Sequence, residues 1–153
     1  MADSAILNKR NDFLIIMAID YGDVRTGIAV CDKFEMLASP VCVITQRNTA
    51  KLITEIAELA VKHKAEQIVV GLPKNMDSSI GSRAEKCSEF AQELSAVTGI
   101  ECVMRDERLS TVSAHNVLNT TNTRGKKRKS VVDQVAAVMI LQDYIDYRKN
   151  KRD

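Results

Sequence analysis

The chain has 153 residues, of which 45% are hydrophobic and 27% charged, with a formal net charge of +2. This length and balance indicate one soluble globular domain with a full core. No segment approaches the ~20 apolar residues that span a bilayer, so we expect no membrane association and a cytoplasmic protein. Aromatic residues make up only 4% of the chain, which disfavours base stacking on aromatic platforms.

The four cysteines and two histidines show no pattern of a redox or zinc site. The cysteines are far apart, form no C-x-x-C pair and lie within apolar patterns, which indicates buried free thiols. His63 and His115 are too isolated to hold zinc. Chemistry must therefore come from other residue types.

Apolar periodicity predicts five strands and four helices. We expect residues 1–12 to be a flexible tail, because they are polar and aperiodic. The expected strands are 13–20, 26–31, 39–44, 67–70 and 100–105. The expected helices are 49–63, 82–98, 111–118 and 131–147. Residues 119–129 contain no apolar side chain and predict a flexible basic loop, and residues 148–153 predict a charged tail.

The element order is therefore β-β-β-α-β-α-β-α-α, within a single domain over residues 13–147. Three closely linked strands favour an antiparallel meander, and the later strands are joined by helical crossovers. This order predicts an α/β fold with a mixed five-stranded central sheet and helices on both faces. Ligands in such sheets gather at the carboxyl ends of strands, where the strand order reverses.

Asp20 lies at that place, at the end of the first predicted strand. Gly22 and Gly27 follow it in a short polar turn, and a second apolar run then begins. The glycines supply the backbone freedom that a hairpin needs. A carboxylate at this edge is a candidate ligand for a metal ion.

Two further acids lie at the ends of expected elements. Glu107 follows the fifth strand, and Asp133 shares a helix face with the apolar Ala137 and Leu141, so it should face the sheet. Carboxylates that repel one another need a cation to neutralise them, and Mg²⁺ or Mn²⁺ prefers oxygen ligands. Two such ions about 4 Å apart can catalyse phosphodiester cleavage without a protein nucleophile.

Each acid also has an alternative explanation. Asp20 could simply end a strand and begin a turn. Glu107 could form a surface ion pair with Arg105 or Arg108. Asp133 could cap the last helix, because Ser130 lies three residues before it in a capping-box pattern.

Four motifs in order resemble the YqgF/RuvX family of the RNase H-like superfamily, over residues 17–147. Members are described as Holliday-junction-resolvase-like proteins and as pre-16S ribosomal RNA nucleases. The motifs are Asp20-x-Gly22-x-x-Arg25-x-Gly27-x-Ala29, then Gly71-Leu72-Pro73 with Gly81, then Asp106-Glu107-Arg108-Leu109-Ser110-Thr111, and finally Asp133-x-x-Ala136-Ala137 with Ile140-Leu141-Gln142.

The resemblance implies an RNase H-like fold with Asp20, Glu107 and Asp133 as metal-binding catalytic acids. It also implies maturation of the 5′ end of the small-subunit ribosomal RNA. The chain departs from many superfamily members, which carry an acid after the fourth strand where this sequence has Gly71. Glu107 would take over that role.

Basic residues are candidates for nucleic-acid contacts. Arg25 could bind a phosphate or pair with Asp23, and Arg108 could clamp a phosphate with its planar fork. A basic cluster precedes Asp133, and five phosphate contacts would make single-strand binding fall as about the 3.5 power of salt concentration. The cluster consists of Arg124, Lys126, Lys127, Arg128 and Lys129.

Other motif residues have supporting roles. Ser110 and Thr111 are expected to cap the following helix, with phosphate contact as the alternative. Gly22, Gly27 and Gly71 allow close backbone approach or end elements.

The sequence favours a metal-dependent endonuclease acting on structured RNA such as pre-rRNA, in contact with ribosomal assembly intermediates. A Holliday-junction resolvase acting on branched DNA and a weakly catalytic nucleic-acid-binding factor are the alternatives. A sugar kinase or ATPase of the actin type needs two such domains, and 153 residues cannot supply them. The sequence leaves open the RNA or DNA substrate, the endonuclease or exonuclease mode, the choice of Mg²⁺ or Mn²⁺, the oligomeric state and the role of the N-terminal tail.

Overall fold

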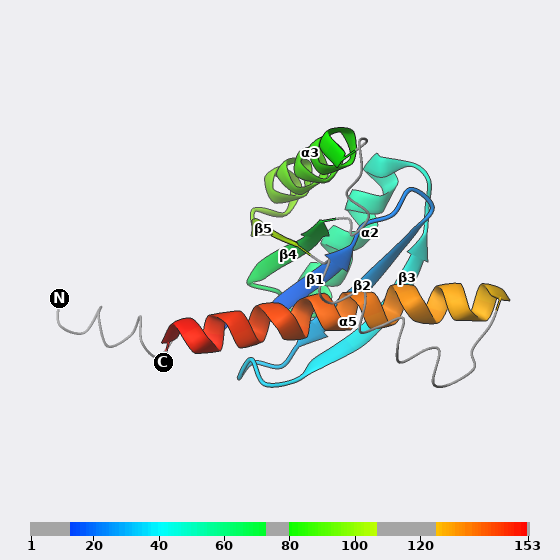
Figure 1. Ribbon diagram of the computed structural model, residues 1–153. Helices are drawn as coiled ribbons and strands as arrows, with labels where there is room; N and C mark the ends of the chain where they lie inside the picture. Colours follow the sequence, from blue (N-terminus) through cyan, green and yellow to red (C-terminus); the bar gives the residue numbers. More distant parts are fainter. Residues whose placement is uncertain (1–12, 73–79, 107–124, 153) are drawn as a thin grey trace.

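A computed structural model describes residues 13–72, 80–106 and 125–152 of the chain. Within these residues one five-stranded sheet is covered by helices (Figure 1). The strands are β1 (Ile16–Asp20), β2 (Arg25–Cys31), β3 (Ala38–Thr45), β4 (Gln67–Leu72) and β5 (Glu101–Asp106). The helices are α2 (Thr49–Lys62), α3 (Ile80–Thr98) and α5 (Gly125–Arg152).

The sheet has the strand order β3-β2-β1-β4-β5. Short turns join β1 to β2 and β2 to β3, and these pairs are antiparallel, as hairpin connections require. The pairs β1–β4 and β4–β5 are parallel, because helical crossovers return the chain to the same edge. The predicted meander and mixed sheet are therefore confirmed, with β1 at the boundary between the two halves.

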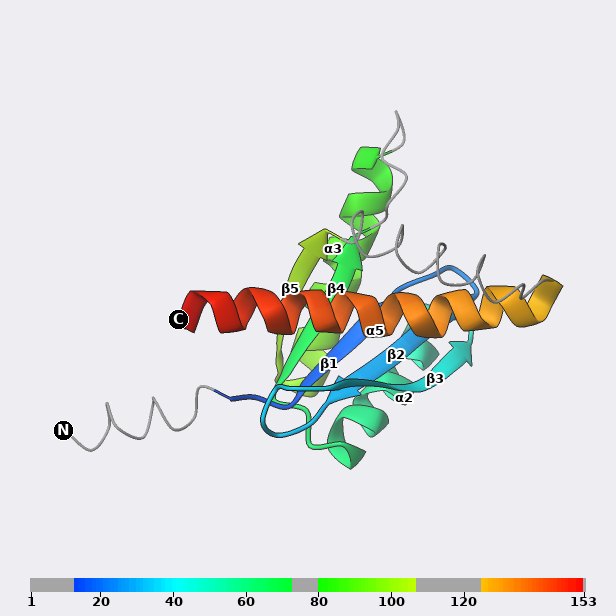
Figure 2. The same ribbon diagram turned by 60° about the horizontal axis from the view of Figure 1, so that its bottom comes forward.

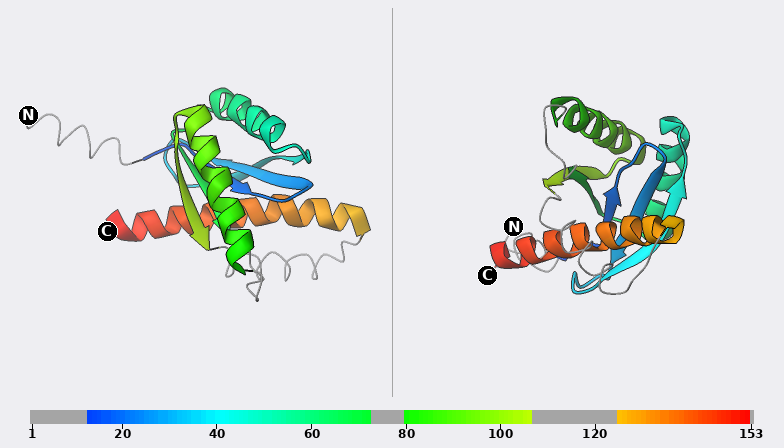
Figure 3. Two further views of the ribbon diagram at one scale, coloured as in Figure 1. Left: turned by 90° about the horizontal axis from the view of Figure 1, so that it is seen from above. Right: turned by 45° about the vertical axis from the view of Figure 1, so that its right-hand side comes forward.

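Helices cover both faces of the sheet, as predicted (Figure 1, Figure 3). Along β1, Met17 and Ile19 pack in a core cluster with residues of α2 and α3. Ile16 and Ala18 point the other way and pack in a second cluster with residues of α5. This alternation follows from the two-residue period of a strand. Every one of these β1 side chains is fully buried.

Local signals position the helices on the sheet. The Asn48 side chain accepts a hydrogen bond from Lys51 N (3.0 Å) and caps the first turn of α2. Gly99, directly after α3, adopts φ 72° and ends that helix. Within the described residues, no helix is long and apolar enough to cross a membrane.

The last helix corrects two sequence predictions. It begins at Gly125 and ends at Arg152, whereas the sequence predicted residues 131–147. Residues 125–129 are therefore helical and not part of a flexible loop, and residues 148–152 are helical and not a charged tail. Both errors equate polarity with loop, although Lys and Arg are good helix formers. The tail 1–12, the expected helix 111–118 and residues 119–124 lie outside the described residues.

None of the four cysteines forms a disulfide, as predicted, but only Cys31 and Cys87 are buried, whereas Cys42 and Cys102 are partly exposed. Burial raises the pKa of Cys31 and of Cys102 to about 11. Both thiols are therefore protonated at neutral pH, which suits packing and not reactivity.

Candidate active site

Asp20 is the last residue of β1, as predicted. The strand alternation places Ile16 and Ala18 on the α5 face of the sheet, and Asp20 follows them in the same series. Its side chain is half-buried, at the edge where the core gives way to solvent. This carboxylate is therefore on the face of the sheet that α5 covers, at the carboxyl end of the strand where the strand order reverses.

The parallel half of the sheet brings two other strand ends to the same edge. Ile19 pairs with Val70 of β4, and Val70 pairs with Met104 of β5. One step further along, Asp20 is therefore level with Gly71 and Arg105. Neighbouring strands are about 4.8 Å apart, and β5 is two strands away from β1. The backbones of Asp20 and Arg105 are therefore about 10 Å apart.

The direction of α5 is fixed by contacts near its C-terminus. Arg148 Nε donates to Glu35 Oε1 (2.7 Å), and Glu35 Oε2 accepts from Leu14 N (2.6 Å) just before β1. Followed back from Arg148, the helix crosses obliquely toward the carboxyl ends of the strands (Figure 2). Asp133 lies fifteen residues before Arg148, or about 22 Å.

The early start of α5 also changes the alternative explanation for Asp133. Asp133 is eight residues beyond Gly125, well inside the helix, so the predicted capping box with Ser130 is wrong. The face that continues from Asp133 is the buried one. Ala137 and Leu141, four and eight residues later, are fully buried against the sheet.

The turn after Asp20 is built on a close backbone approach. A Cβ at Gly22 would lie 2.1 Å from the carbonyl oxygen of Arg25, far inside any allowed contact. The Thr26 hydroxyl closes the turn, since its Oγ1 accepts from Gly22 N (3.3 Å). Gly27 pairs with Asp20 across the hairpin. The structure gives a steric reason for glycine at position 22, and the supporting role of Gly22 and Gly27 in the site stays a prediction.

Gly22→Ala is expected to destabilise the protein by about 1–3 kcal/mol, because the new methyl forces a backbone shift. The same shift should displace Asp20 and lower nuclease activity. Urea unfolding followed by circular dichroism, together with a cleavage assay, measures both effects. Gly99→Ala is the control. Its φ of 72° strains an alanine, but a Cβ there would have no atom within 4 Å, so this variant tests backbone strain without a steric clash. A Gly22→Ala protein with wild-type stability and activity would refute this role.

Sequence reasoning missed an aromatic pair beneath the site. The ring of Tyr21, next after Asp20, stacks on Phe90 of α3 with centroids 4.0 Å apart and planes 5° apart. Both rings are buried. The sequence did contain a signal for the burial of Tyr21, because Tyr21 follows Met17 and Ile19 at the two-residue spacing of one strand face. This stack anchors the end of β1 to α3.

The turn is also tied to α3 by an exposed ion pair. Lys86 Nζ lies 2.7 Å from Asp23 Oδ1. The alternative explanation of Arg25, a surface pair with Asp23, stays open, because the two oxygens of that carboxylate can accept from both cations. Arg25 itself is half-buried at the start of β2.

Several predicted site residues lie outside what the structure describes. Among the described side chains, no group of three or more His, Cys, Asp or Glu could hold a metal ion. That search excludes Glu107 and the side chain of Asp133, so the metal site stays a prediction. The residues beyond description are Glu107, Arg108, Ser110, Thr111 and Arg124, and the side chains of Asp133 and of Lys126, Lys127, Arg128 and Lys129.

The family model of RuvX, described as Holliday junction resolvase, matches residues 14–147. The chain belongs to the RuvX family. A relative from Halothermothrix orenii, named "Putative pre-16S rRNA nuclease", is 44% identical over 133 residues, covering 87% of this chain and 95% of the relative. A relative of the same name from Agathobacter rectalis is 39% identical over 140 residues, covering 90% and 98%.

Solved structures support the fold of this RuvX-family chain. The chain resembles RuvC of Thermus thermophilus in complex with a Holliday junction substrate, with a TM-score of 0.59 and 12% identity over 90% of this chain and 96% of that one. A second structure of Thermus thermophilus RuvC gives a TM-score of 0.56 at 11% identity, covering 90% and 97%. The predicted RNase H-like fold is confirmed. The family model is described as a resolvase and the relatives are named as nucleases, so this chain is a hydrolase acting on phosphodiester bonds.

Proposed function

We propose that this RuvX-family nuclease is a metal-dependent endonuclease for structured RNA, which processes the 5′ end of pre-16S rRNA in the cytoplasm and meets its substrate on ribosomal assembly intermediates. The observation that carries the proposal is the position of Asp20. Its carboxylate ends the central strand on the face covered by α5, at the edge shared with β4 and β5. The proposed substrate, pre-16S rRNA, is taken from the names of the relatives.

We assign the metal-binding and catalytic roles to Asp20, Glu107 and Asp133. Asp20 fits a hard cation, because its oxygen donors are half-buried at a strand end. Glu107 lies two residues beyond Arg105, so a strand continued by two residues would carry it on the same face as Arg105. Asp133 is one turn before the buried Ala137. Bound Mg²⁺ or Mn²⁺ would supply an activated water and stabilisation of the leaving oxygen.

The remaining motif residues would handle the phosphate backbone. Arg25 begins β2 beside the turn that follows Asp20, within reach of a strand lying across the site. Arg108 directly follows Glu107 and would clamp a neighbouring phosphate with its planar fork. Gly71, level with Asp20, would let the substrate backbone approach the sheet edge. Ser110 and Thr111 would cap or contact phosphate there.

A four-way DNA junction is the second candidate substrate, because the matching family model is described as Holliday junction resolvase. RNA and DNA present the same phosphodiester to the acids, so discrimination must come from 2′-hydroxyl contacts and shape. A factor that binds but cuts only weakly is the third candidate. These candidates differ in what they bind and what they cut.

A substrate panel separates the three candidates. Purified full-length protein is incubated with Mg²⁺ or Mn²⁺ and with precursor rRNA, unstructured RNA or a four-way DNA junction, and products are resolved on gels. We expect metal-dependent internal cleavage of the precursor rRNA only. Symmetric cutting of the junction with intact RNA would establish the resolvase, and tight binding without products would establish the binding factor.

The helical start of α5 changes the expected salt dependence of binding. Consecutive residues of a helix are about 100° apart around its axis. The four basic positions 126–129 therefore cannot all face one RNA strand. With about three contacts in place of five, binding to single-stranded RNA should fall as about the second power of salt concentration.

Fluorescence anisotropy between 50 and 300 mM salt measures this slope. Each replacement by Gln at a contacting position should reduce the slope by about 0.7. Lys62→Gln, on the last turn of α2, serves as the matched control with an unchanged slope. A slope near zero, or one that no replacement in the cluster alters, would contradict the role of this cluster.

A further inference from the structure

Four large apolar side chains are exposed at the end of the sheet where β1 begins. Phe34, Met36 and Leu37 belong to the turn between β2 and β3, and their exposed fractions are 55%, 74% and 65%. Phe13, which precedes β1, is 45% exposed. Contiguous exposed apolar surface of this kind marks an interaction site, because a partner that covers it removes it from water. We call these four residues the apolar patch.

A cavity of about 380 Å³ lies within the apolar patch, between the turn and α5. Phe13, Phe34 and Met36 line it together with the buried Ile145 of α5. Pockets that accept ligands range from about 300 to 1,000 Å³, so this one has room for side chains of a partner. Because Met36 is also largely exposed, the same surface has a protruding side chain beside a hollow.

The turn that carries three of these side chains is held in place by hydrogen bonds. Asp32 Oδ1 accepts from Met36 N (2.8 Å) and from Leu37 N (2.9 Å). Glu35, at φ 51°, turns its carboxylate inward to Arg148 of α5 (2.7 Å). The neighbouring apolar side chains are thereby left on the outside. A surface that is ordered before binding loses little conformational entropy when a partner docks.

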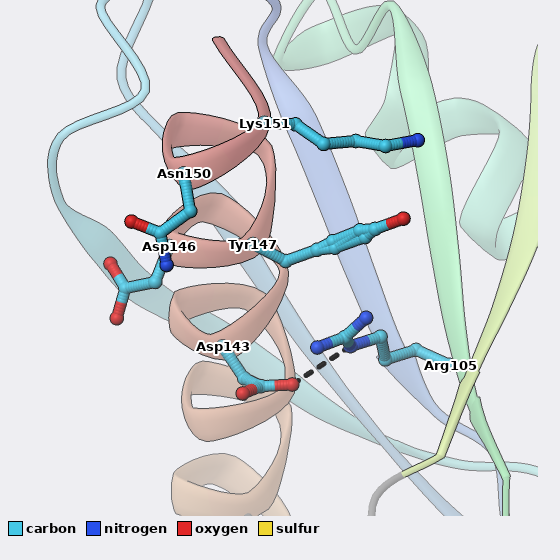
Figure 4. Close-up of a pocket in the computed structure, with 6 residues that line it drawn as sticks. All are labelled: Arg105, Asp143, Asp146, Tyr147, Asn150 and Lys151. Atoms are coloured by element: carbon cyan, nitrogen blue, oxygen red, sulfur yellow. Dashed lines mark hydrogen bonds and ion pairs between the residues drawn. The ribbon is translucent and has the colours of Figure 1, made fainter. Parts of the chain in front are cut away.

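Charges of both signs surround the apolar patch. Lys33 Nζ lies 5.2 Å from the centre of the Phe34 ring, and the exposed Lys149 lines the cavity from α5. Asp146 also lines the cavity and projects from α5 on the side away from Arg105 (Figure 4). A partner with one sign of charge would meet a like charge on this rim. A second copy related by a two-fold axis can instead place its lysines opposite Asp146 of the first.

The apolar area of the patch fits one side of a dimer interface. At about 200 Å² for each full side chain, the four exposed fractions amount to roughly 500 Å². A standard interface buries about 800 Å² per partner, of which about 57%, or roughly 450 Å², is apolar. Because the protrusion and the hollow belong to one surface, a two-fold pairing would fill the hollows of both copies at once.

We propose that two copies of this chain associate through the apolar patch as a two-fold dimer, in which Met36 and Leu37 of each copy enter the cavity of the other. The inference goes beyond the proposed function and does not depend on it. Phe13 precedes β1 and Asp20 ends it, so the interface is at the opposite end of the strand from the proposed metal site. Association through this patch leaves the Asp20 end of each copy open to substrate.

Sedimentation velocity of the purified full-length protein at about 1 µM and at about 200 µM tests the proposal, because the dimer fraction depends on protomer concentration. We expect the wild type to be dimeric at the upper concentration. Met36→Glu places a charge in the interface and should raise the dimer dissociation constant by about 30-fold or more, the effect of losing a central interface residue. Leu37→Glu should act in the same direction.

Val97→Glu is the matched control. Val97 is 61% exposed and lies on α3, which packs on the other face of the sheet from α5, so this variant should dimerise as the wild type does. Circular dichroism should show the native spectrum for all three variants, since each replaced side chain is mainly exposed.

Three results would overturn the inference. A wild-type protein that is monomeric at the upper concentration would mean that the patch receives a different occupant, either residues 1–12 or another protein. A dimer that both Met36→Glu and Leu37→Glu leave intact would form through another surface. Equal weakening by Val97→Glu would show that an added negative charge, and not the apolar patch, controls association.

Discussion

Asp20→Asn is expected to lower the cleavage rate by about 10³-fold, the upper end of the cost of removing one preorganised electrostatic group. Asparagine keeps the size and shape of the side chain but removes the charge that would neutralise a divalent cation. Because the strand end lies at the rim of the core, the fold should be retained. Single-turnover cleavage and metal-free RNA binding, measured on the same preparation, separate cutting from binding.

The matched control for this variant is Asp23→Asn. Asp23 lies in the same turn, three residues later, and is exposed in its ion pair with Lys86. Loss of that negative charge should change the rate by less than about twofold, since exposed pairs contribute less than about 1 kcal/mol. RNA binding by Asp20→Asn should equal that of the wild type. An Asp20→Asn protein that cuts at the wild-type rate would exclude the metal site.

Arg148→Gln is expected to lower the free energy of unfolding by about 3–5 kcal/mol, the cost of breaking a buried ion pair by removing one partner. The Glu35 side chain is fully buried, and Arg148 meets both of its oxygens, at 2.7 and 3.2 Å. The hydrogen bond to Glu35 holds the pKa of Arg148 above its usual value. Without Arg148, the buried carboxylate of Glu35 loses its cationic partner, while the bond from Leu14 N remains.

Urea unfolding at neutral pH measures this loss. Lys86→Gln, which breaks an ion pair whose side chains are more than half exposed, is the control and should cost less than about 1 kcal/mol. Glu35→Gln with Arg148 intact should also be destabilising, because it leaves the cation with a neutral partner. A loss below about 1 kcal/mol in Arg148→Gln would show that the pair does not hold α5 on the sheet.

The sheet could be predicted from the sequence because its signals are local. The apolar run that ends at Asp20 and the run that begins after Thr26 have the two-residue period and glycine-marked turn of a hairpin. The buried face of α5 could also be predicted, because Ala137, Ile140 and Leu141 repeat at helical spacing. In the structure all three are fully buried. Local patterns of this kind need no knowledge of distant partners.

The ends of α5 and the ties that hold it could not be predicted in the same way. Residues 125–130 and 148–152 carry no apolar stripe, so periodicity gave no helical signal there. The pairings of Arg148 with Glu35 and of Arg105 with Asp143 span 113 and 38 residues. Such contacts depend on where the sheet brings distant elements together, which a one-dimensional pattern does not contain.

The central claim is that Asp20, Glu107 and Asp133 converge on a pair of divalent ions. Anomalous X-ray scattering from crystals of the wild-type protein soaked in Mn²⁺, at the concentration that supports half-maximal cleavage, tests it most directly. We expect two peaks about 4 Å apart, with carboxylate oxygens of these three residues at about 2.0–2.2 Å. Peaks at other residues, or coordination that excludes Asp20, would contradict the account.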